Sequence, residues 1–237
     1  MKKYLATLIP LVTLVVAGLA MDTSQNQKKL LFQQNEEKRG TIAWYVKKAK
    51  NKKVGKVVLL PVDENPVIVS RLDDALAQYT AIIAQPIEKK SYVATEDSLM
   101  TWHRFKVLEV LSQPSKATCS GCLGELKVPS DLPLSLTGDE ILVPTGGGSV
   151  IVDGVKVVSK DQYFSKHFLP SQKYLLFVSH DITRGVGKLR LGPYGVFAID
   201  SEGNIRSIVS GETELKRDLS TNIGDSLNRL KQHIRER

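Results

Sequence analysis

Short apolar segments separated by glycine-containing turns recur about every ten residues from residue 91 to residue 210, and this spacing constrains the fold most strongly. The clearest pair is valine-rich and flanks Asp153-Gly154, a dipeptide that favours a two-residue type I′ hairpin turn. Ser201-Glu202-Gly203 predicts a second hairpin, and the run KYLLFVSH at 173–180 predicts a strand buried on both faces. We therefore expect a mainly β fold, either a sandwich or a barrel, with an OB-type barrel as one candidate.

Two irregularities are predicted within the β region. The alternation of residues 91–112 slips in phase at Val107-Leu108, which indicates a bulge or a bent strand. The triple glycine Gly146 to Gly148 invites comparison with a phosphate-binding loop. It lacks the Gly-Lys-Ser/Thr ending and leads into a strand instead of a helix, so a tight turn is favoured.

Helices are expected on both sides of the β region. Apolar spacing predicts a short amphipathic helix over roughly 36–50, followed by a strand at 57–62. The segment SRLDDALAQYTAIIA at 70–84 predicts the clearest helix, with Ser70 and Asp73 at its start and Pro86 ending it. In the tail at 212–237, leucines and isoleucines lie at helical spacing interrupted by Gly224, which predicts a C-terminal helix.

The first twenty residues have the layout of a secretory signal peptide. Met1-Lys2-Lys3 is basic, residues 4–16 are apolar, and Ala17-Gly18-Leu19-Ala20 offers a small-residue cleavage site. The alternative is a membrane anchor that is kept, because the apolar run reaches the lower length limit of a spanning helix. Pro10 and the small-residue exit favour cleavage near Ala20. We therefore expect an exported protein, periplasmic, envelope-bound or secreted, with a signal peptide at 1–20, a polar and basic segment at 21–56 and one β-rich domain with flanking helices at 57–237.

The net charge of +8 is concentrated in one segment, because residues 28–56 hold ten lysines and arginines against two glutamates. The basic surface segment is predicted to consist of Lys47, Lys48, Lys50, Lys52, Lys53 and Lys56. A solvated lysine-rich turn is the simpler interpretation. The alternative is attraction to an anionic envelope polymer or membrane surface, worth about 1 kcal/mol per lysine. A basic segment on a nearly neutral body is not the pattern of a nucleic-acid groove, so no nucleic-acid partner is expected.

Cys119 and Cys122, in KATCSGCLGEL, are the two cysteines of the chain. A redox dithiol normally precedes a helix, but Pro129 leaves no room for a helix of useful length. A zinc site needs two more ligands, and the four histidines are scattered. Export to an oxidising compartment favours a local disulfide, worth about 2 kcal/mol for so small a loop. The redox and metal interpretations stay open as lesser alternatives.

The remaining polar residues do not form a recognisable catalytic pattern. His103 lies on a predicted strand without a partner at a defined spacing, which favours a hydrogen-bonded or exposed histidine over a metal ligand. His180-Asp181 would need a distant serine, and no G-x-S-x-G motif is present in the sequence. We predict no catalytic residues, no metal site and no cofactor.

Several motifs resemble those of a loose group of uncharacterised secreted bacterial proteins. In this chain they are Arg71 to Leu76, Thr101 to Leu111, Gly146 to Gly148, Lys173 to Phe177 and Gly195 to Ile199. Ser171-Gln172 stands where the group has a turn glycine, a small departure. The resemblance implies a compact β-barrel-like module of unknown function and carries over no catalytic residue.

The sequence thus favours an exported, non-enzymatic β-domain protein that binds a partner or interacts with the cell envelope. The alternative function is a periplasmic thiol-disulfide oxidoreductase that uses Cys119 and Cys122.

Overall fold

The structure, a computed structural model, describes residues 38–59, 69, 71–114, 128–129, 132, 138–159, 164, 168–181 and 185–237. The predicted signal peptide, Cys119 and Cys122 lie outside these residues. The chain divides into two compact units. Unit 1 comprises the chain up to residue 57 together with 95–97 and 151–157, and unit 2 comprises 58–94, 98–150 and 158–237.

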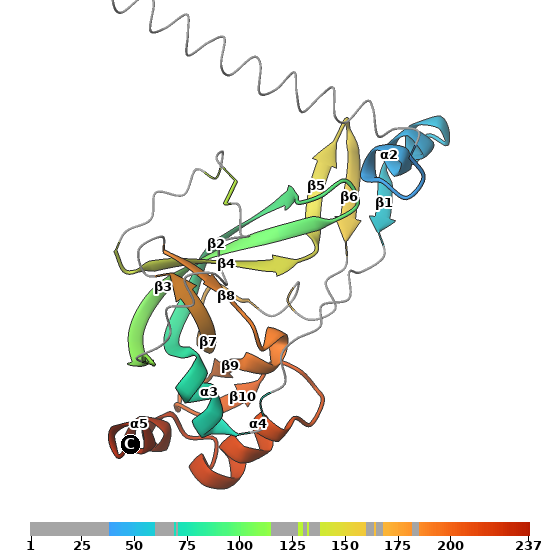
Figure 1. Ribbon diagram of the computed structural model, residues 1–237. Coiled ribbons are helices and arrows are strands. Elements are labelled where there is room, and N and C mark those ends of the chain that lie inside the picture. The colour runs from blue at the N-terminus through green and yellow to red at the C-terminus, as the bar shows by residue number, and fades with distance from the viewer. Residues whose placement is uncertain are drawn as a thin grey trace, which may run out of the picture. The chain divides into compact units, whose positions relative to one another are not determined.

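A seven-stranded sheet forms the body of unit 2 (Figure 1). Its strands are β2 (Thr80–Val93), β3 (Leu99–Ser112), β4 (Glu140–Gly146), β7 (Lys173–Asp181), β8 (Val186–Lys188), β9 (Val196–Ile199) and β10 (Ile205–Ser207), in the order β10-β9-β7-β2-β3-β4-β8. Strand β8 also pairs with β7, so β7, β2, β3, β4 and β8 close into a ring. The β4–β8 pairing is parallel, at Leu142 and Val186, and the other neighbours in the ring are antiparallel. This is the strand order of an OB-type barrel, so the prediction of a mainly β, barrel-like fold is confirmed.

The helix predicted over 70–84 is wrong in its second half. Helix α3 spans Leu72–Gln78 only, and β2 begins at Thr80. Along β2, Ala81 and Ile83 belong to one core cluster, whereas the alternate residues Ile82 and Ala84 belong to another. Because both faces of this part of β2 are buried, its apolar residues follow one another without polar interruption, and periodicity cannot distinguish them from a buried helix.

Pro86 does not end a helix but lies within β2. It pairs with Phe105 of β3, and the register of the two strands shifts between Pro86 and Glu88. Such an irregularity tolerates a residue without an N–H group. A second register shift lies between Ile83, opposite Glu109, and Ala84, opposite Val107, and leaves Leu108 as the extra residue. The bulge predicted at Val107-Leu108 is therefore confirmed.

The start of α3 is capped by a residue from a distant part of the sequence. Asp218 Oδ2 accepts a hydrogen bond of 2.7 Å from the Leu72 N–H, and the N-cap residue Arg71 makes no side-chain cap bond. Asp73 was expected to help cap this helix, but its carboxylate accepts a 2.9 Å hydrogen bond from His233 Nε2. This hydrogen bond is the main reason why the pKa of Asp73 lies below its ordinary value.

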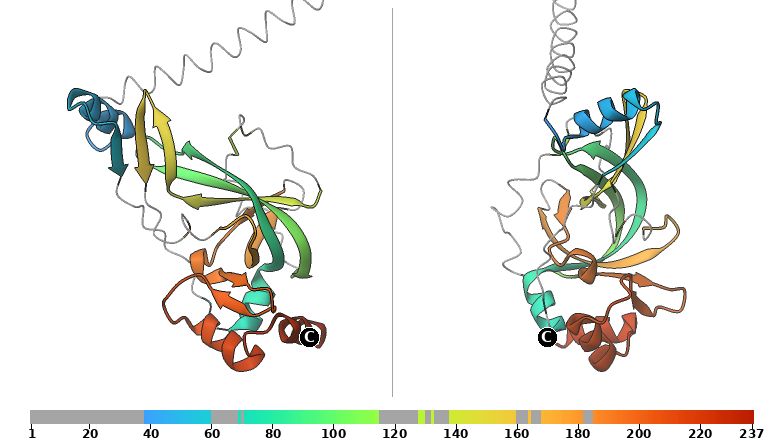
Figure 2. Two further views of the ribbon diagram at one scale, coloured as in Figure 1. Left: turned by 180° about the vertical axis from the view of Figure 1, so that it is seen from behind. Right: turned by 90° about the vertical axis from the view of Figure 1, so that its right-hand side faces the viewer.

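The C-terminal segment forms two short helices around a π-helical turn. Helix α4 spans Glu214–Asp218, the π turn spans Leu219–Ile223, and α5 spans Leu227–Arg235. Gly224 breaks the segment in a left-handed conformation, with φ of 59°. The helices lie together with α3 at one end of unit 2 (Figure 2). Their buried residues share a core cluster with α3, β7 and β9: Leu215, Leu219, Ile223 and Leu230. The predicted C-terminal helix is confirmed, with the break at Gly224.

His103 is a buried and hydrogen-bonded residue of the barrel. Its side chain is 3% exposed, its Nε2 lies 2.9 Å from Thr145 Oγ1, and its ring packs edge-on against Phe168. Burial lowers the pKa of His103 to about 3, and the positive charge of Lys89 adds a smaller effect. The interpretation of His103 as a structural histidine is confirmed.

The triple glycine joins two sheets. Strand β4 ends at Gly146, and β5 (Gly148–Val152) begins a second sheet with the order β1-β6-β5. Gly148 has φ of 130°, and a Cβ atom there would lie 2.3 Å from Thr101 Oγ1. The segment is therefore a close-packed kink between two strands, and its conformation at Gly148 requires glycine.

The described part of unit 1 combines helix α2 with the tip of a hairpin (Figure 1). Helix α2 spans Ile42–Asn51 and begins six residues later than predicted, after Thr41, whose Oγ1 accepts the Trp44 N–H at 3.2 Å. Strand β1 spans Lys56–Leu59, and β6 spans Val155–Ser159. Asp153 and Gly154 between β5 and β6 have φ of 49° and 79°, which confirms the two-residue turn of the I′ type. None of the helices in the described part of the chain has the length and apolar character needed to cross a membrane.

We predict that His103 makes unfolding pH-dependent. The unfolded histidine takes up a proton as the pH falls through about 6.5, but the folded residue does so only near pH 3. This difference should lower the free energy of unfolding by about 2 kcal/mol between pH 7 and pH 5. Denaturant unfolding at the two pH values measures the loss. The double variant His103→Leu/Thr145→Val removes both buried polar partners and should lack this part of the loss.

Asp73 and Asp200 do not interfere with this test, because the pKa of each is lowered from 3.8 and both stay ionised between pH 5 and pH 7. An equal loss in the wild-type protein and the double variant would contradict the assignment to His103. The single variant Thr145→Val serves as the control that leaves the histidine in place.

Candidate functional site

The most distinctive chemical feature of the described residues is a basic surface on unit 1. Helix α2 buries Ile42, Ala43, Val46 and Ala49. The six lysines predicted to form a basic surface segment are all exposed: Lys47, Lys48, Lys50, Lys52, Lys53 and Lys56. The buried residues fall on one face because of their helical spacing, and this leaves the lysines of α2 to face solvent.

Lys156 adds a seventh lysine that sequence reasoning missed. It lies on β6, and its N–H donates a 2.9 Å hydrogen bond to the Gly55 carbonyl oxygen, which brings it next to Lys56 at the start of β1. Its neighbours Val155 and Val157 are buried, whereas Lys156 is exposed. The alternation of the predicted hairpin indicated this exposure, but not the proximity to a segment 100 residues earlier. We define the basic surface as the six lysines above together with Lys156.

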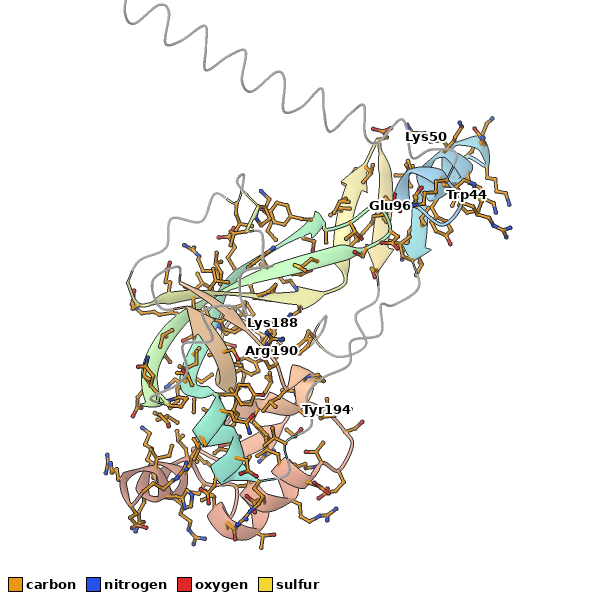
Figure 3. The ribbon with its side chains drawn as sticks, viewed as in Figure 1. Trp44, Lys50, Glu96, Lys188, Arg190 and Tyr194 are labelled. Atoms are coloured by element: carbon orange, nitrogen blue, oxygen red, sulfur yellow. The ribbon has the colours of Figure 1, made fainter. Side chains whose placement is uncertain are left out.

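The positive charge of unit 1 is only partly offset within the unit. Its described residues include nine lysines and arginines and three acidic residues. Lys50 Nζ lies 3.0 Å from Asp153 Oδ2, and Lys38 pairs with Glu96. Figure 3 labels Lys50 and Glu96. Lys48 Nζ lies 4.7 Å from the centre of the Trp44 ring, a cation–π arrangement. Among the described residues, Lys52, Lys53, Lys56 and Lys156 have no ion-pair partner.

Lys53 adopts a backbone conformation that normally belongs to glycine. Its φ is 55°, and it follows the last turn of α2. The Lys53 N–H bonds to the Lys50 carbonyl and the Val54 N–H bonds to the Ala49 carbonyl, at 3.0 and 2.9 Å. This is the Schellman pattern of a helix C-terminus, in which the left-handed position is usually glycine. A lysine here costs about 1 kcal/mol of backbone strain and places one more cation on the basic surface.

Unit 2 contains an open groove of about 420 Å³ between the end of β3 and the start of β4. Its apolar lining includes Ile82, Val107 and Ile141, and its acidic lining consists of Glu109, Asp139 and Glu140. Each carboxylate has a cationic partner: Lys231 at 2.6 Å, Lys106 at 3.8 Å and Arg104 at 3.6 Å, respectively. These ion pairs reduce the acidic character of the groove, and the described lining carries no hydroxyl, thiol or imidazole group.

The described polar residues do not form a cluster that could bind a metal ion. Within the described ranges, no three His, Cys, Asp or Glu side chains lie close enough to hold a metal ion. His103 and His233 lie in different surroundings, one bonded to Thr145 and the other to Asp73. The disulfide and redox interpretations concern Cys119 and Cys122, which lie outside the described residues, and both stay predictions.

No protein-family model, no curated protein and no solved structure matches this chain. The resemblance to secreted bacterial β-domain proteins therefore stays an expectation from the motifs. The functional argument depends on the geometry of the chain itself.

We predict that Cys119 and Cys122 form a structural disulfide. The reduction potential of the pair, measured by equilibration with glutathione or dithiothreitol buffers, should lie below about −300 mV. A value between about −120 and −270 mV is typical of thiol-disulfide enzymes and would support the oxidoreductase alternative instead. The variant Cys119→Ser/Cys122→Ser should lose no more than about 2 kcal/mol of stability, because the loop that the bridge closes is short.

Proposed function

We propose that this protein is a non-catalytic binding module of the cell envelope that attaches to an anionic partner through the basic surface of unit 1. The observation that carries the proposal is the cluster of exposed lysines on α2, the following turn, β1 and β6, of which Lys52, Lys53, Lys56 and Lys156 have no ion-pair partner among the described residues. Several lysines on one small unit attract an extended anionic partner more strongly than scattered lysines do, because their potentials add.

The conformation of Lys53 gives independent support. A left-handed backbone position at a helix C-terminus favours glycine, so a lysine at this position lowers the free energy of unfolding. Strained residues that persist in a fold cluster at functional sites. A role for the Lys53 side chain in binding explains why the chain carries a cation where glycine would be more stable.

The contacts of the buried polar residues have a structural explanation and do not favour a catalytic function. His103 is hydrogen-bonded to Thr145, and Thr101 Oγ1 donates a 2.8 Å hydrogen bond to the Gly147 carbonyl and also lies 2.8 Å from Ser91 Oγ. These contacts hold the barrel strands and the glycine kink together. Export to the cell envelope is the expectation from the first twenty residues and forms part of the same proposal.

We predict that removing three lysine charges weakens binding to anionic partners. The variant Lys52→Gln/Lys53→Gln/Lys56→Gln should bind vesicles containing anionic phospholipid, or soluble polyphosphate, on the order of 100-fold more weakly than wild type. Wild-type affinity should also fall as salt is raised, since exposed charges are screened. Binding is measured by vesicle co-sedimentation and by fluorescence anisotropy of labelled polyphosphate.

The matched control removes three exposed lysines of unit 2, in the variant Lys89→Gln/Lys90→Gln/Lys173→Gln. This variant has the same net charge as the test variant and should bind like wild type. Equal weakening by both triple variants would mean that only net charge matters and would contradict a defined basic surface. Absence of wild-type binding to either anionic probe would overturn the proposal.

We further predict that Lys53→Gly has opposite effects on stability and binding. Relief of the left-handed strain should raise the free energy of unfolding by about 0.5 to 1 kcal/mol. Loss of one cation should weaken binding to the same anionic probes about fivefold. Thermal or denaturant unfolding and vesicle co-sedimentation measure the two effects. Lys52→Gly, at a residue with φ of −88°, is the control that should not gain stability.

A further inference from the structure

Ile151 is the most exposed large hydrophobic side chain among the described residues. Its exposed fraction is 76%, and it lies on β5 two residues before the Asp153-Gly154 turn of unit 1. Val54, which ends the α2 turn, is 47% exposed in the same unit. An isoleucine that is exposed to this extent gains little from burial within its own chain, so its position raises the question of what it contacts.

Lys156 is the cross-strand neighbour of Ile151, and Lys56 lies one strand further on. A two-residue hairpin turn places Ile151 directly opposite Lys156, and directly opposed residues point to the same face. The bond from the Lys156 N–H to the Gly55 carbonyl brings Lys56 alongside Lys156. Lys56, Lys156 and Ile151 therefore form a row across β1, β6 and β5. The adjacent β6 residues Val155 and Val157 point to the other face and are buried.

The one acidic residue at the hairpin tip is neutralised. Asp153 lies two residues from Ile151, and its carboxylate is held at 3.0 Å by Lys50. The tip therefore presents an apolar side chain with cations beside it. A soluble polyanion would contact the lysines alone, since it offers no apolar phase to an isoleucine. An anionic bilayer offers both phosphate groups and acyl chains, and basic surfaces with protruding apolar side chains are typical of interfacial binding.

We infer that unit 1 docks on the surface of an anionic lipid bilayer, with Ile151 entering the headgroup and acyl-chain boundary and Lys56 and Lys156 on the lipid phosphates. This inference rests on the proposed function and narrows its anionic partner to lipid. The chain then contacts the membrane peripherally through the hairpin tip of unit 1.

The experiment compares the chain without its predicted signal peptide (residues 1–20) and two variants on vesicles of anionic phospholipid, vesicles of zwitterionic phospholipid, and soluble polyphosphate. Ile151→Thr keeps a β-branched residue in the strand and removes most of the apolar surface. It should weaken binding to anionic vesicles about tenfold and leave polyphosphate binding unchanged. The control Leu169→Thr changes another exposed hydrophobic residue, 54% exposed and located in unit 2, and should have no effect on either probe.

A direct measure of insertion uses Ile151→Trp. Its fluorescence should be quenched by lipids brominated on the acyl chain beyond the quenching of the native tryptophans in wild type. Unchanged vesicle binding by Ile151→Thr, without added quenching of Ile151→Trp, would overturn the lipid inference. If the triple lysine variant still loses binding, the proposed function stands. If wild type binds neither vesicles nor polyphosphate, both fail together.

Discussion

The burial of both faces of β2 and β7 is the constraint on which the fold of unit 2 depends. Along β7, Tyr174, Leu176 and Val178 belong to the core cluster inside the ring of strands, and Leu175 and Phe177 belong to the cluster under α3, α4 and α5. Strand β2 alternates in the same way, so the two paired strands form a wall shared by two cores. A one-residue slip of either strand would exchange the two sets of side chains, so packing on both sides fixes the register.

The sequence predicted those features whose cause is local. The Asp153-Gly154 turn, the strand at 173–180 and the bulge near Leu108 each depend on a few adjacent residues, and the structure confirms them. The helix over 70–84 failed because a strand buried on both faces lacks the alternation that identifies a strand. Closure of the ring at Leu142 and Val186, and capping of α3 by Asp218, join residues far apart in sequence and left no local signal.

The candidate site likewise combines features that the sequence predicted with features that depend on long-range contacts. A run of lysines is visible in the sequence, and the structure adds that α2 turns its apolar face inward and that all six lysines are exposed. Lys156 and Ile151 join the same unit only because the β5–β6 hairpin pairs with β1, a long-range event. The left-handed φ of Lys53 was also invisible, because the sequence places lysine where the helix end favours glycine. Departures of this kind from local preference are expected at functional or strained sites.

The electrostatic field at each part of the surface of unit 1 depends on which lysines pair with acidic side chains. A type I′ turn favours Asp or Asn before glycine, so the turn chemistry itself puts a carboxylate at the tip of the hairpin. Left alone, Asp153 would repel an anionic surface from Ile151. Lys50 cancels this charge at an exposed site, where an ion pair contributes at most about 1 kcal/mol to stability. The Lys50–Asp153 pair therefore matters more for the sign of the local field than for the fold. Lys38 offsets Glu96 in the same way, whereas Lys52, Lys53, Lys56 and Lys156 have no acidic partner among the described residues.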